Sequence, residues 1–196
     1  MYQPQKEQHY TLEEYWQLVD TSPDQKYEYV DGYVRMMTAG SPAHAQLQSR
    51  LSYLLTHALE ESECNAYGPD AKVRVSEKRY YCPDACVSCD PADWTCGREL
   101  RSPSVVVEVL SPSTERVDRT EKLAAYQALP TIQDILLADS RRRYVEHYHR
   151  ILPHALQEWR HFVYDQEEQL VHLPCIEVSF SLRQLYRKVY LEDEDV

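Results

Sequence analysis

Two carboxylates in the middle of the chain have the types and positions of metal ligands. Glu108 is the one acid in the apolar run 105–110, and Asp84 follows Pro83 where another β-rich segment begins. A carboxylate inside a buried strand is destabilising unless it is paired or bound to a cation. Carboxylates, water and substrate phosphate are the ligands that Mg²⁺ prefers. The pair predicts a magnesium site, and the alternative is a structural ion pair between Glu108 and an arginine of the next helix.

A candidate lysine follows in the segment after Glu108. Asp118, Lys122 and Tyr126 stand four residues apart in a helix expected over about 116–128, so their side chains share one face. Because this helix directly follows the strand of Glu108, it can pack back over the end of that strand. The Lys122 ammonium could then approach a metal-bound phosphate. The alternative is an Asp–Lys pair on a solvated helix face.

The elements that must position these residues have a mixed α/β order. A short helix is expected over 11–20, where Thr11 and Glu14 form a capping box. The dipeptide Asp31-Gly32 between β-rich runs predicts a hairpin that pairs Val30 with Tyr33 and Glu28 with Arg35. Ser41-Pro42 opens the longest helix, expected to reach about residue 62.

Several strands and one last helix are expected after that. The apolar segments 104–110 and 134–139 are typical of strands buried on both faces. Residues 90–102 are expected to form a connector, and 181–191 a last helix. The other expected strands cover residues 72–76, 80–89, 144–150, 158–165, 170–173 and 176–180.

The ordered motifs resemble a known nuclease family. PDA at 83–85, VVVEVLSPST at 105–114 and the three helix residues are similar to the PD-(D/E)XK nuclease superfamily. Together with YEYVDGYVRMM and the following SPAH, they more closely resemble the Uma-type bacterial family of putative restriction endonucleases. The resemblance covers about residues 11–140. It implies a restriction-endonuclease-like core: a central mixed β-sheet flanked by helices, with an N-terminal helix and hairpin.

The resemblance also implies a reaction and a set of site residues. It implies metal-dependent hydrolysis of phosphodiester bonds in nucleic acid, with DNA as the expected substrate. Asp84, Glu108 and the backbone carbonyl of Val109 would hold Mg²⁺ or Mn²⁺, and Lys122 would be catalytic. The chain departs from the superfamily at Leu110, where a lysine is usual, and Lys122 is the matching position in the Uma-type family.

Four more residues would line the site if the resemblance holds: Glu28, His44, Asp118 and Tyr126. Glu28 and His44 match positions that recur near the site of this family. Glu28 could instead pair with Arg35, and His44 could be an ordinary hydrogen-bonded residue at the start of a helix.

Length and charge bound the rest of the interpretation. The 196 residues, 43% hydrophobic and 27% charged, are expected to form one domain over 1–196, with residues 1–40 as an extension and 191–196 as an acidic tail. The formal net charge of −11 disfavours generic binding to nucleic acid. It favours the alternative of a catalytically silent module that binds nucleic acid or protein. Arg98, Arg101 and the run 141–143 could supply local positive charge.

The cysteines and the N-terminus bear on compartment and assembly. No secretory signal or long apolar run is evident, so we expect a cytoplasmic protein without a membrane span and without a disulfide framework. Cys82, Cys86, Cys89 and Cys96 resemble a loose zinc spacing, but we expect ordinary small apolar side chains. Cutting both strands of a duplex would favour a homodimer.

Overall fold

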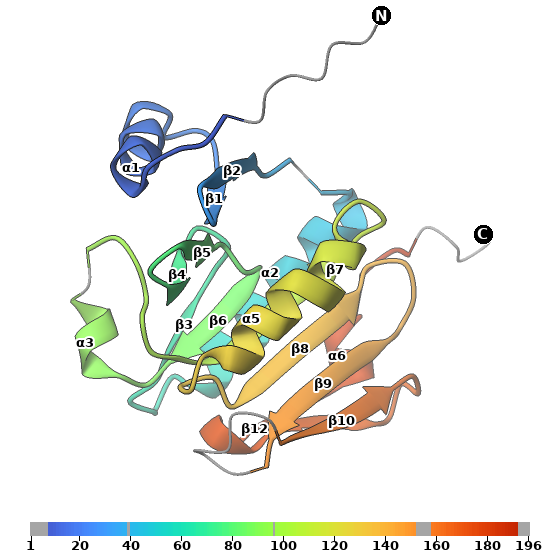
Figure 1. Ribbon diagram of the computed structural model, residues 1–196. Helices are drawn as coiled ribbons and strands as arrows, with labels where there is room; N and C mark the ends of the chain where they lie inside the picture. Colours follow the sequence, from blue (N-terminus) through green and yellow to red (C-terminus); the bar gives the residue numbers. More distant parts are fainter. Residues whose placement is uncertain (1–7, 39, 96, 152–157, 192–196) are drawn as a thin grey trace, which may run out of the picture.

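A six-stranded mixed sheet forms the centre of the computed structural model, which describes residues 8–38, 40–95, 97–151 and 158–191. The N-terminal residues 1–7, Cys96 and the acidic tail from 192 onward lie outside this part. Strands β7 and β8 are parallel, with Glu108 opposite Leu137, and every other pair is antiparallel. The order (Figure 1) is β10 (Trp159–Tyr164), β9 (Val145–Arg150), β8 (Asp134–Asp139), β7 (Pro103–Leu110), β6 (Ala85–Ser88) and β3 (Asn65–Tyr67).

A smaller four-stranded sheet carries the N-terminal hairpin. Its order is β2 (Tyr33–Met36), β1 (Tyr27–Val30), β5 (Arg79–Tyr81) and β4 (Val73–Ser76). The predicted hairpin register is confirmed, with Glu28 opposite Arg35. Both turn residues have positive φ, 52° at Asp31 and 98° at Gly32, as a two-residue hairpin turn of this kind requires. Because β1 also pairs with β5, residues before 40 are hydrogen-bonded to the body of the chain.

The predicted N-terminal helix covers the smaller sheet. Helix α1 (Leu12–Thr21) begins at Thr11 with the expected capping box to Glu14. Its buried residue Tyr15 packs against tyrosines of β1 and β5 in an aromatic cluster.

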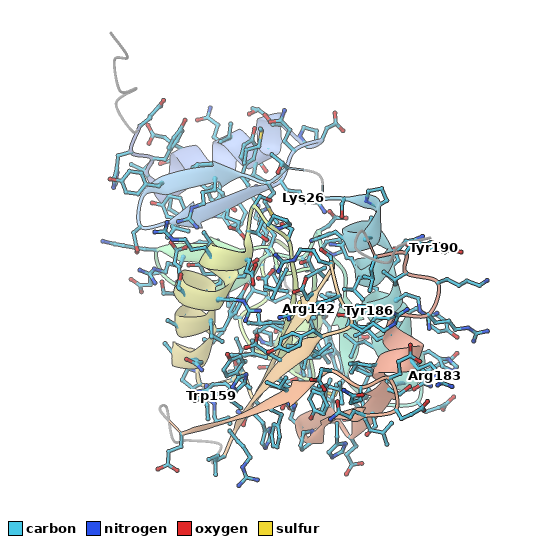
Figure 2. All side chains as sticks on the ribbon, turned by 90° about the vertical axis from the view of Figure 1, so that its right-hand side faces the viewer. Lys26, Arg142, Trp159, Arg183, Tyr186 and Tyr190 are labelled. Carbon is cyan, nitrogen blue, oxygen red and sulfur yellow. A yellow bond between two sulfur atoms is a disulfide. The ribbon has the colours of Figure 1, made fainter. Side chains whose placement is uncertain are left out.

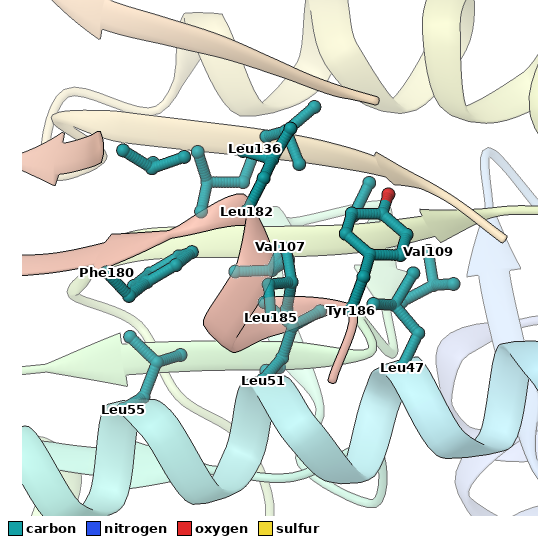
Figure 3. Close-up of a cluster of buried hydrophobic side chains, with 14 of the residues drawn as sticks. Leu47, Leu51, Leu55, Val107, Val109, Leu136, Phe180, Leu182, Leu185 and Tyr186 are labelled. Atoms are coloured by element: carbon teal, nitrogen blue, oxygen red, sulfur yellow. The ribbon is translucent and has the colours of Figure 1, made fainter. Parts of the chain in front are cut away.

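One face of the large sheet is covered by the long helix. Helix α2 (Pro42–Ala58) turns Leu47, Leu51 and Leu55 toward Val107 and the C-terminal elements (Figure 3). Those elements are α6 (Leu182–Leu185) and the hairpin of β11 (Leu170–Leu173), the 3₁₀ turn η2 (Pro174–Ile176) and β12 (Val178–Ser181). Burial of an apolar stripe every three to four residues explains why α2 lies along this face.

The C-terminal segment also closes the end of the sheet. The Tyr186 hydroxyl donates a hydrogen bond of 2.8 Å to the carbonyl of Asp139, at the end of β8. Arg142, labelled with Tyr186 in Figure 2, is close enough for its charge to act on this hydroxyl. This contact joins the last described elements to the loop between β8 and β9.

The other face carries the helix that follows β7. It consists of α4 (Glu115–Val117), a π-helical turn η1 (Asp118–Lys122) and α5 (Leu123–Ala128), seen in yellow in front of the sheet in Figure 1. Strand β7 is buried on both sides, as its apolar run predicts. Val107 and Val109 face α2, whereas Val106 and Leu110 face α5. Glu108 therefore faces the α5 side, by the alternation of a strand.

Several predicted boundaries differ from the structure. The expected strand 80–89 is two strands in different sheets, because the chain bends at Cys82-Pro83-Asp84, where proline cannot donate to a ladder. Helix α2 ends at Ala58 rather than near 62, and the last helix is a single turn. A short helix, α3 (Pro91–Trp94), lies in the connector, and strand β3 was not expected.

The expectation that the cysteines form no disulfide is wrong for one pair. Cys64 and Cys89 are bonded across the edge of the large sheet, with Cα atoms 4.1 Å apart. The register explains the bond, because Asn65 pairs with Ser88. Cys64, just before β3, therefore stands opposite Cys89, just after β6. Cys82, Cys86 and Cys175 are free.

Within the described part of the chain, no helix has both the length and the apolar composition needed to cross a bilayer.

Candidate active site

The candidate residues meet at the end of β7, where the first turn of α2 and the π-helical turn approach from opposite faces of the sheet. Ser41 caps α2 by accepting a hydrogen bond from the backbone N–H of His44, which fixes His44 in the first turn. Gly40 leaves room for it, since a Cβ there would come within 2.7 Å of the His44 ring. Glu108 approaches from β7 on the side of Lys122.

Lys122 is buried among three carboxylates. Its Nζ lies 2.9 Å from Glu28 Oε1, 3.1 Å from Glu108 Oε1 and 3.4 Å from Asp118 Oδ1. The lysine is 4% exposed, and none of the three acids is more than 4% exposed. This excludes the solvated-face alternative for the Asp118–Lys122 pair. It also shows that Glu108 pairs with a lysine rather than with an arginine.

Glu108 has a second donor in Tyr126. The Tyr126 hydroxyl donates a 2.6 Å hydrogen bond to Glu108 Oε1, the same oxygen that Lys122 approaches. Oε2 of Glu108 receives no hydrogen bond from the described residues and remains available as a ligand. Burial raises the pKa of Glu108 well above its ordinary value, and the carboxylates of Asp118 and Asp84 raise it further against the effect of Lys122.

Lys122 nevertheless stays charged. Burial alone would lower the pKa of its ammonium, but Glu108, Glu28 and Asp118 outweigh burial and hold the pKa well above its ordinary value. Burial also raises the pKa of Asp118, whose Oδ1 is buried without a well-formed hydrogen bond. The cluster therefore favours the protonated forms of Glu108, Asp118 and Lys122.

Asp84 stands on the α2 side of the same strand end. Its Oδ2 accepts a 2.6 Å hydrogen bond from the backbone N–H of Val109, and its Oδ1 accepts one of 2.5 Å from Gln48. His44 Nε2 lies 3.6 Å from Asp84 Oδ2. Burial would lower the pKa of His44, but Asp84 outweighs it, and the net shift is upward. Asp84 and Glu108 are close enough for the Asp84 charge to raise the pKa of Glu108.

The π-helical turn is what brings Lys122 inward. The N–H of Leu123 bonds to the carbonyl of Asp118, five residues earlier. We expected regular α-helical spacing from Asp118 to Tyr126, and the wider turn corrects that expectation. Single π turns within helices are frequent at functional sites. Here the turn buries both Asp118 and Lys122 over Glu108.

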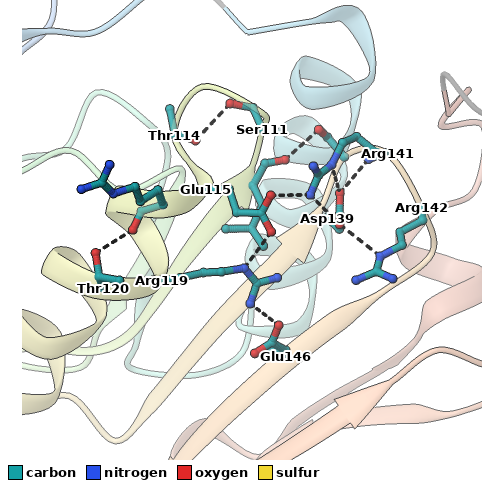
Figure 4. Close-up of polar contacts among 12 residues, drawn as sticks. Ser111, Thr114, Glu115, Arg119, Thr120, Asp139, Arg141, Arg142 and Glu146 are labelled. Atoms are coloured by element: carbon teal, nitrogen blue, oxygen red, sulfur yellow. Dashed lines mark hydrogen bonds and ion pairs between the residues drawn. The ribbon is translucent and has the colours of Figure 1, made fainter.

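An ionic network braces the loops around the site (Figure 4). Arg141 joins Asp139 at the end of β8 to Glu115 at the start of the helix, with both distances 2.8 Å. Arg119 joins Glu115 to Glu146 of β9. These contacts fix the segment between β7 and η1, and hence the position of Lys122.

The arginines expected to supply local positive charge all have acidic partners. Arg141 and Arg142 pair with Asp139 and Arg143 with Glu167, while Arg98 pairs with Asp20 and Arg101 with Glu99.

All the predicted site residues lie at this end of the sheet, in two linked groups. Glu28, Glu108, Asp118, Lys122 and Tyr126 form one group, and Asp84, His44 and the backbone of Val109 form the other. The alternative in which Glu28 pairs with Arg35 is wrong. Arg35 pairs with Glu121, and the Glu28 carboxylate pairs with Lys122.

Sequence reasoning missed Gln48. It lies one helical turn after His44, and that i, i+4 spacing on the first turns of α2 is the signal that could have identified it.

The donors at this strand end fit a divalent cation. Three carboxylates, from Glu28, Glu108 and Asp118, surround the single ammonium of Lys122, and a fourth, from Asp84, lies close enough to act on Glu108. Carboxylate oxygens are hard ligands of the kind that Mg²⁺ and Mn²⁺ take. The hydrogen bonds to Asp84 leave further lone pairs on both of its oxygens.

The chain is similar to proteins of one family. The Uma2 family, described as "Putative restriction endonuclease", matches residues 12–184. An uncharacterized protein of Synechocystis sp. (strain ATCC 27184 / PCC 6803 / Kazusa), slr1290, is 36% identical over 176 residues, which cover 89% of this chain and 90% of that protein. Another uncharacterized Synechocystis protein, sll1609, is 28% identical over 144 residues, 72% of this chain and 81% of that one.

A solved structure has the same fold. It is the crystal structure of a protein described as a putative nuclease belonging to DUF820, from Anabaena variabilis ATCC 29413. The two structures match with a TM-score of 0.74 at 19% identity, over 92% of this chain and 99% of the other. The expected fold class, a mixed α/β nuclease-like core, is thereby confirmed.

Proposed function

The chain belongs to the Uma2 family of putative restriction endonucleases, and from this premise we propose that it is a metal-dependent endonuclease that hydrolyses phosphodiester bonds of DNA. The observation that carries the proposal is the Lys122 ammonium, buried 3.1 Å from Glu108 at the strand end where Asp84 also lies. A lysine beside a pair of carboxylates is an arrangement suited to phosphoryl chemistry.

Asp84, Glu108 and the carbonyl of Val109 are the groups that would hold Mg²⁺ or Mn²⁺. When bound, such a cation stabilises the negative charge that develops on the attacked phosphate and the leaving oxygen. His44 and Gln48 hold the Asp84 carboxylate in place from α2.

Lys122 acts on the phosphate or on the attacking water. Glu28 and Asp118 hold its ammonium protonated and pointed at Glu108. From that position it would neutralise charge on the transition state or orient the water. Tyr126 fixes the rotamer of Glu108 through its hydrogen bond to Oε1.

A basic groove beside α2 supports nucleic acid as the substrate. It is lined on one side by Ala45, Gln46, Ser49 and Arg50, and on the other by Arg187 and Lys188. Arg50 and Ser49 follow Gln48 directly on the helix that carries His44. Three cations at one groove give a chain of net charge −11 a local surface for phosphates.

We further propose that the active form is a homodimer, because symmetric cutting of two strands needs two sites. Light scattering of the purified chain, with and without duplex DNA, measures this directly.

The activity test compares the parent with Glu108→Gln. Supercoiled plasmid, single-stranded DNA and RNA are incubated with Mg²⁺, Mn²⁺ or EDTA. We expect the parent to nick or linearise plasmid with either metal and not with EDTA, and we expect Glu108→Gln to be inactive. Glu60→Gln, which changes an exposed acid just beyond the C-terminal end of α2, is the matched control and should cleave as the parent does.

Two results would contradict the proposal. If the parent protein binds DNA but does not cleave it with any of the metals, the chain is a catalytically silent binding module. Cleavage by Glu108→Gln at the parental rate would place the reaction elsewhere.

A further inference from the structure

A second cluster of ligand-type side chains lies away from the candidate active site. Asp134 begins β8, and His147 and His149 stand two residues apart on β9, with Asp134 directly opposite His149. Their strand neighbours Leu136, Ala138 and Val145 belong to the core that faces α2. The cluster is therefore on the opposite face of the sheet from Glu108.

The three side chains converge on one carboxylate oxygen. His147 Nε2 lies 2.6 Å and His149 Nδ1 2.8 Å from Asp134 Oδ1, and the three atoms all lie within 4.8 Å of one another. Ligand atoms placed about 2.0–2.2 Å from a tetrahedral Zn²⁺ would stand roughly 3.3 Å apart. Small side-chain shifts would therefore open the space for a cation.

Two buried polar atoms of the cluster lack partners. Asp134 Oδ2 and His147 Nδ1 make no hydrogen bond with the described residues, although Asp134 is fully buried and His147 is 1% exposed. Among those residues, no lysine or arginine pairs with Asp134, and its charge faces the two imidazoles and the Cys175 thiol. A buried carboxylate with a free oxygen and no cation is costly. A bound cation would compensate it.

Cys175 lies beside this cluster on a separate element, outside the three residues whose ligand atoms lie within 4.8 Å of one another. It is a free cysteine in the turn η2, and its Sγ lies 3.9 Å from the carbonyl of Ser104. The same carbonyl accepts a 2.8 Å hydrogen bond from the backbone N–H of Gln133, so the thiol lies beside the start of β8, next to Asp134. The ring of His147 is held on its other side by Phe162, 5.6 Å away between centroids. His149 is one-quarter exposed and offers a path from solvent.

We propose that Asp134, His147 and His149 bind one transition-metal cation of the zinc type, with Cys175 as the fourth ligand. Imidazole and thiolate donors select zinc-like cations over Mg²⁺ and Ca²⁺, which take oxygen ligands. Its ligands come from β8, β9 and the turn between β11 and β12. The cation would therefore bind the C-terminal hairpin to the sheet as a structural centre, independent of nuclease activity.

The test is a titration of the tag-free, chelator-treated chain with Co²⁺ and Zn²⁺. We expect one equivalent of Co²⁺ to bind with a thiolate-to-cobalt charge-transfer band, to be displaced by Zn²⁺ and to be unaffected by excess Mg²⁺. Zn²⁺ should also raise the thermal midpoint of unfolding. Removing a ligand in His149→Ala should weaken binding at least about a hundredfold and abolish the thermal shift.

His172→Ala is the matched control, because His172 is exposed and its ring bonds to Ser179, outside the cluster. It should bind Co²⁺ as the parent does. His149 is partly exposed, so its alanine variant is expected to keep the parental circular dichroism. Equal Co²⁺ affinity in the parent and His149→Ala, or no binding by the parent, would overturn the site. Loss of the charge-transfer band in Cys175→Ser supports the fourth ligand, and its persistence removes Cys175 from the set.

Discussion

At the scale of single residues, the candidate active site has too much negative charge. The ammonium of Lys122 can neutralise one of the carboxylates of Glu28, Glu108 and Asp118, and all of them are buried. A buried carboxylate without a cationic partner lowers the stability of a protein. Carboxylates of this kind are found mainly at functional sites. Two of our predictions, on Glu108→Gln and on pH, follow from this excess, and one, on Lys122→Met, follows from the ammonium itself.

The first concerns Glu108→Gln. The amide keeps an oxygen for the hydrogen bond from Tyr126 but removes one buried negative charge. We expect the metal-free variant to unfold at a higher temperature than the metal-free parent and to bind Mg²⁺ or Mn²⁺ at least about tenfold more weakly. Asp84→Asn should weaken metal binding similarly. Calorimetric titration measures the affinities, and unchanged affinity in Glu108→Gln would show that this carboxylate is not a ligand.

The second concerns Lys122→Met. Without the ammonium, three buried carboxylates lose their shared partner, and the free energy of unfolding should fall by about 3–5 kcal/mol in the absence of metal. Mg²⁺ should restore part of that loss, and cleavage should be abolished. The control is Lys26→Met, because Lys26 (Figure 2) pairs with Asp70 at the surface and should contribute about 0–1 kcal/mol. Equal effects of the two substitutions in urea unfolding would contradict the role of Lys122.

A rescue variant tests where the lysine must act. Leu110 and Glu108 leave the same face of β7, and Leu110 is fully buried in the cluster that contains Tyr126. Adding Leu110→Lys to Lys122→Met should restore a small part of the cleavage rate. Full recovery is not expected, because a displacement of about 1 Å at a catalytic group can reduce the rate by ~10²-fold. A folded double variant with no more activity than Lys122→Met would argue against a shared position for the two ammonium groups.

The third concerns pH. The pKa of Glu108 is raised by burial, and that of His44 is raised by Asp84 against the effect of burial. A raised folded-state pKa contributes stability below the unfolded value, and that stability is lost as pH rises through the folded value. Above about pH 5, the metal-free protein should therefore become less stable as pH increases.

Because Mg²⁺ bound at the proposed site would replace these protons, its stabilising effect should grow over the same range. Thermal unfolding across pH, with EDTA and with Mg²⁺, measures both curves. A Mg²⁺ effect that shrinks as pH rises would contradict the prediction, and in Glu108→Gln the pH dependence of the metal-free curve should be weaker.

At the scale of elements, the sequence predicted those features that are determined by residues close together in the chain. The Asp31-Gly32 turn determines the hairpin register, and the apolar run of β7 identifies a strand buried on both faces. The break at Pro83 was not predicted, because the apolar pattern continues from one sheet into the other.

The polar partners were harder to predict, because they depend on tertiary packing. The π turn after Asp118 carries no strong sequence signal. The convergence of Asp134 with two histidines follows from the antiparallel register of β8 and β9. The sequence itself contained one part of this arrangement, the spacing of His147 and His149 two residues apart on one strand.

The edge of the large sheet gives a prediction about an element pair. The Cys64–Cys89 disulfide joins β3 to β6 across 25 residues of sequence. Loop-closure entropy for a crosslink of that length corresponds to about 3 kcal/mol. Replacing both cysteines with serine should lower the free energy of unfolding by roughly 2–4 kcal/mol under oxidising conditions. In a reducing agent the parent should fall to nearly the stability of the variant. Equal stability of parent and variant without reductant would show that the bond contributes nothing in solution.

At the scale of the whole molecule, the two clusters lie at opposite ends of the sheet. Glu28, Glu108, Asp118 and Lys122 gather on the α5 side at the end of β7, with Asp84 on the α2 side of the same end, while Asp134, His147 and His149 gather on the α2 face at the start of β8. The different chemistry of the donors means that Mg²⁺ and Zn²⁺ should act independently. The net negative charge of the chain, in contrast, repels a polyanion such as DNA, so DNA binding needs a locally basic surface.

The groove along α2 is where that binding is expected. Arg187 and Lys188 line this groove together with Arg50. Arg50 belongs to α2, the helix that holds His44 and Gln48 at Asp84. In Arg187→Glu/Lys188→Glu, phosphate contacts become repulsive, so DNA affinity should fall at least about tenfold and the dependence of log affinity on log salt should become shallower by about two. Mg²⁺ affinity should not change, because neither residue contacts the carboxylates. The matched control is Arg160→Glu, which reverses an exposed charge on β10, away from the groove. Fluorescence anisotropy with labelled duplex at several salt concentrations measures both quantities. If the groove variant and the control have the same affinity and salt slope, DNA follows another path to the site and the groove has no part in binding.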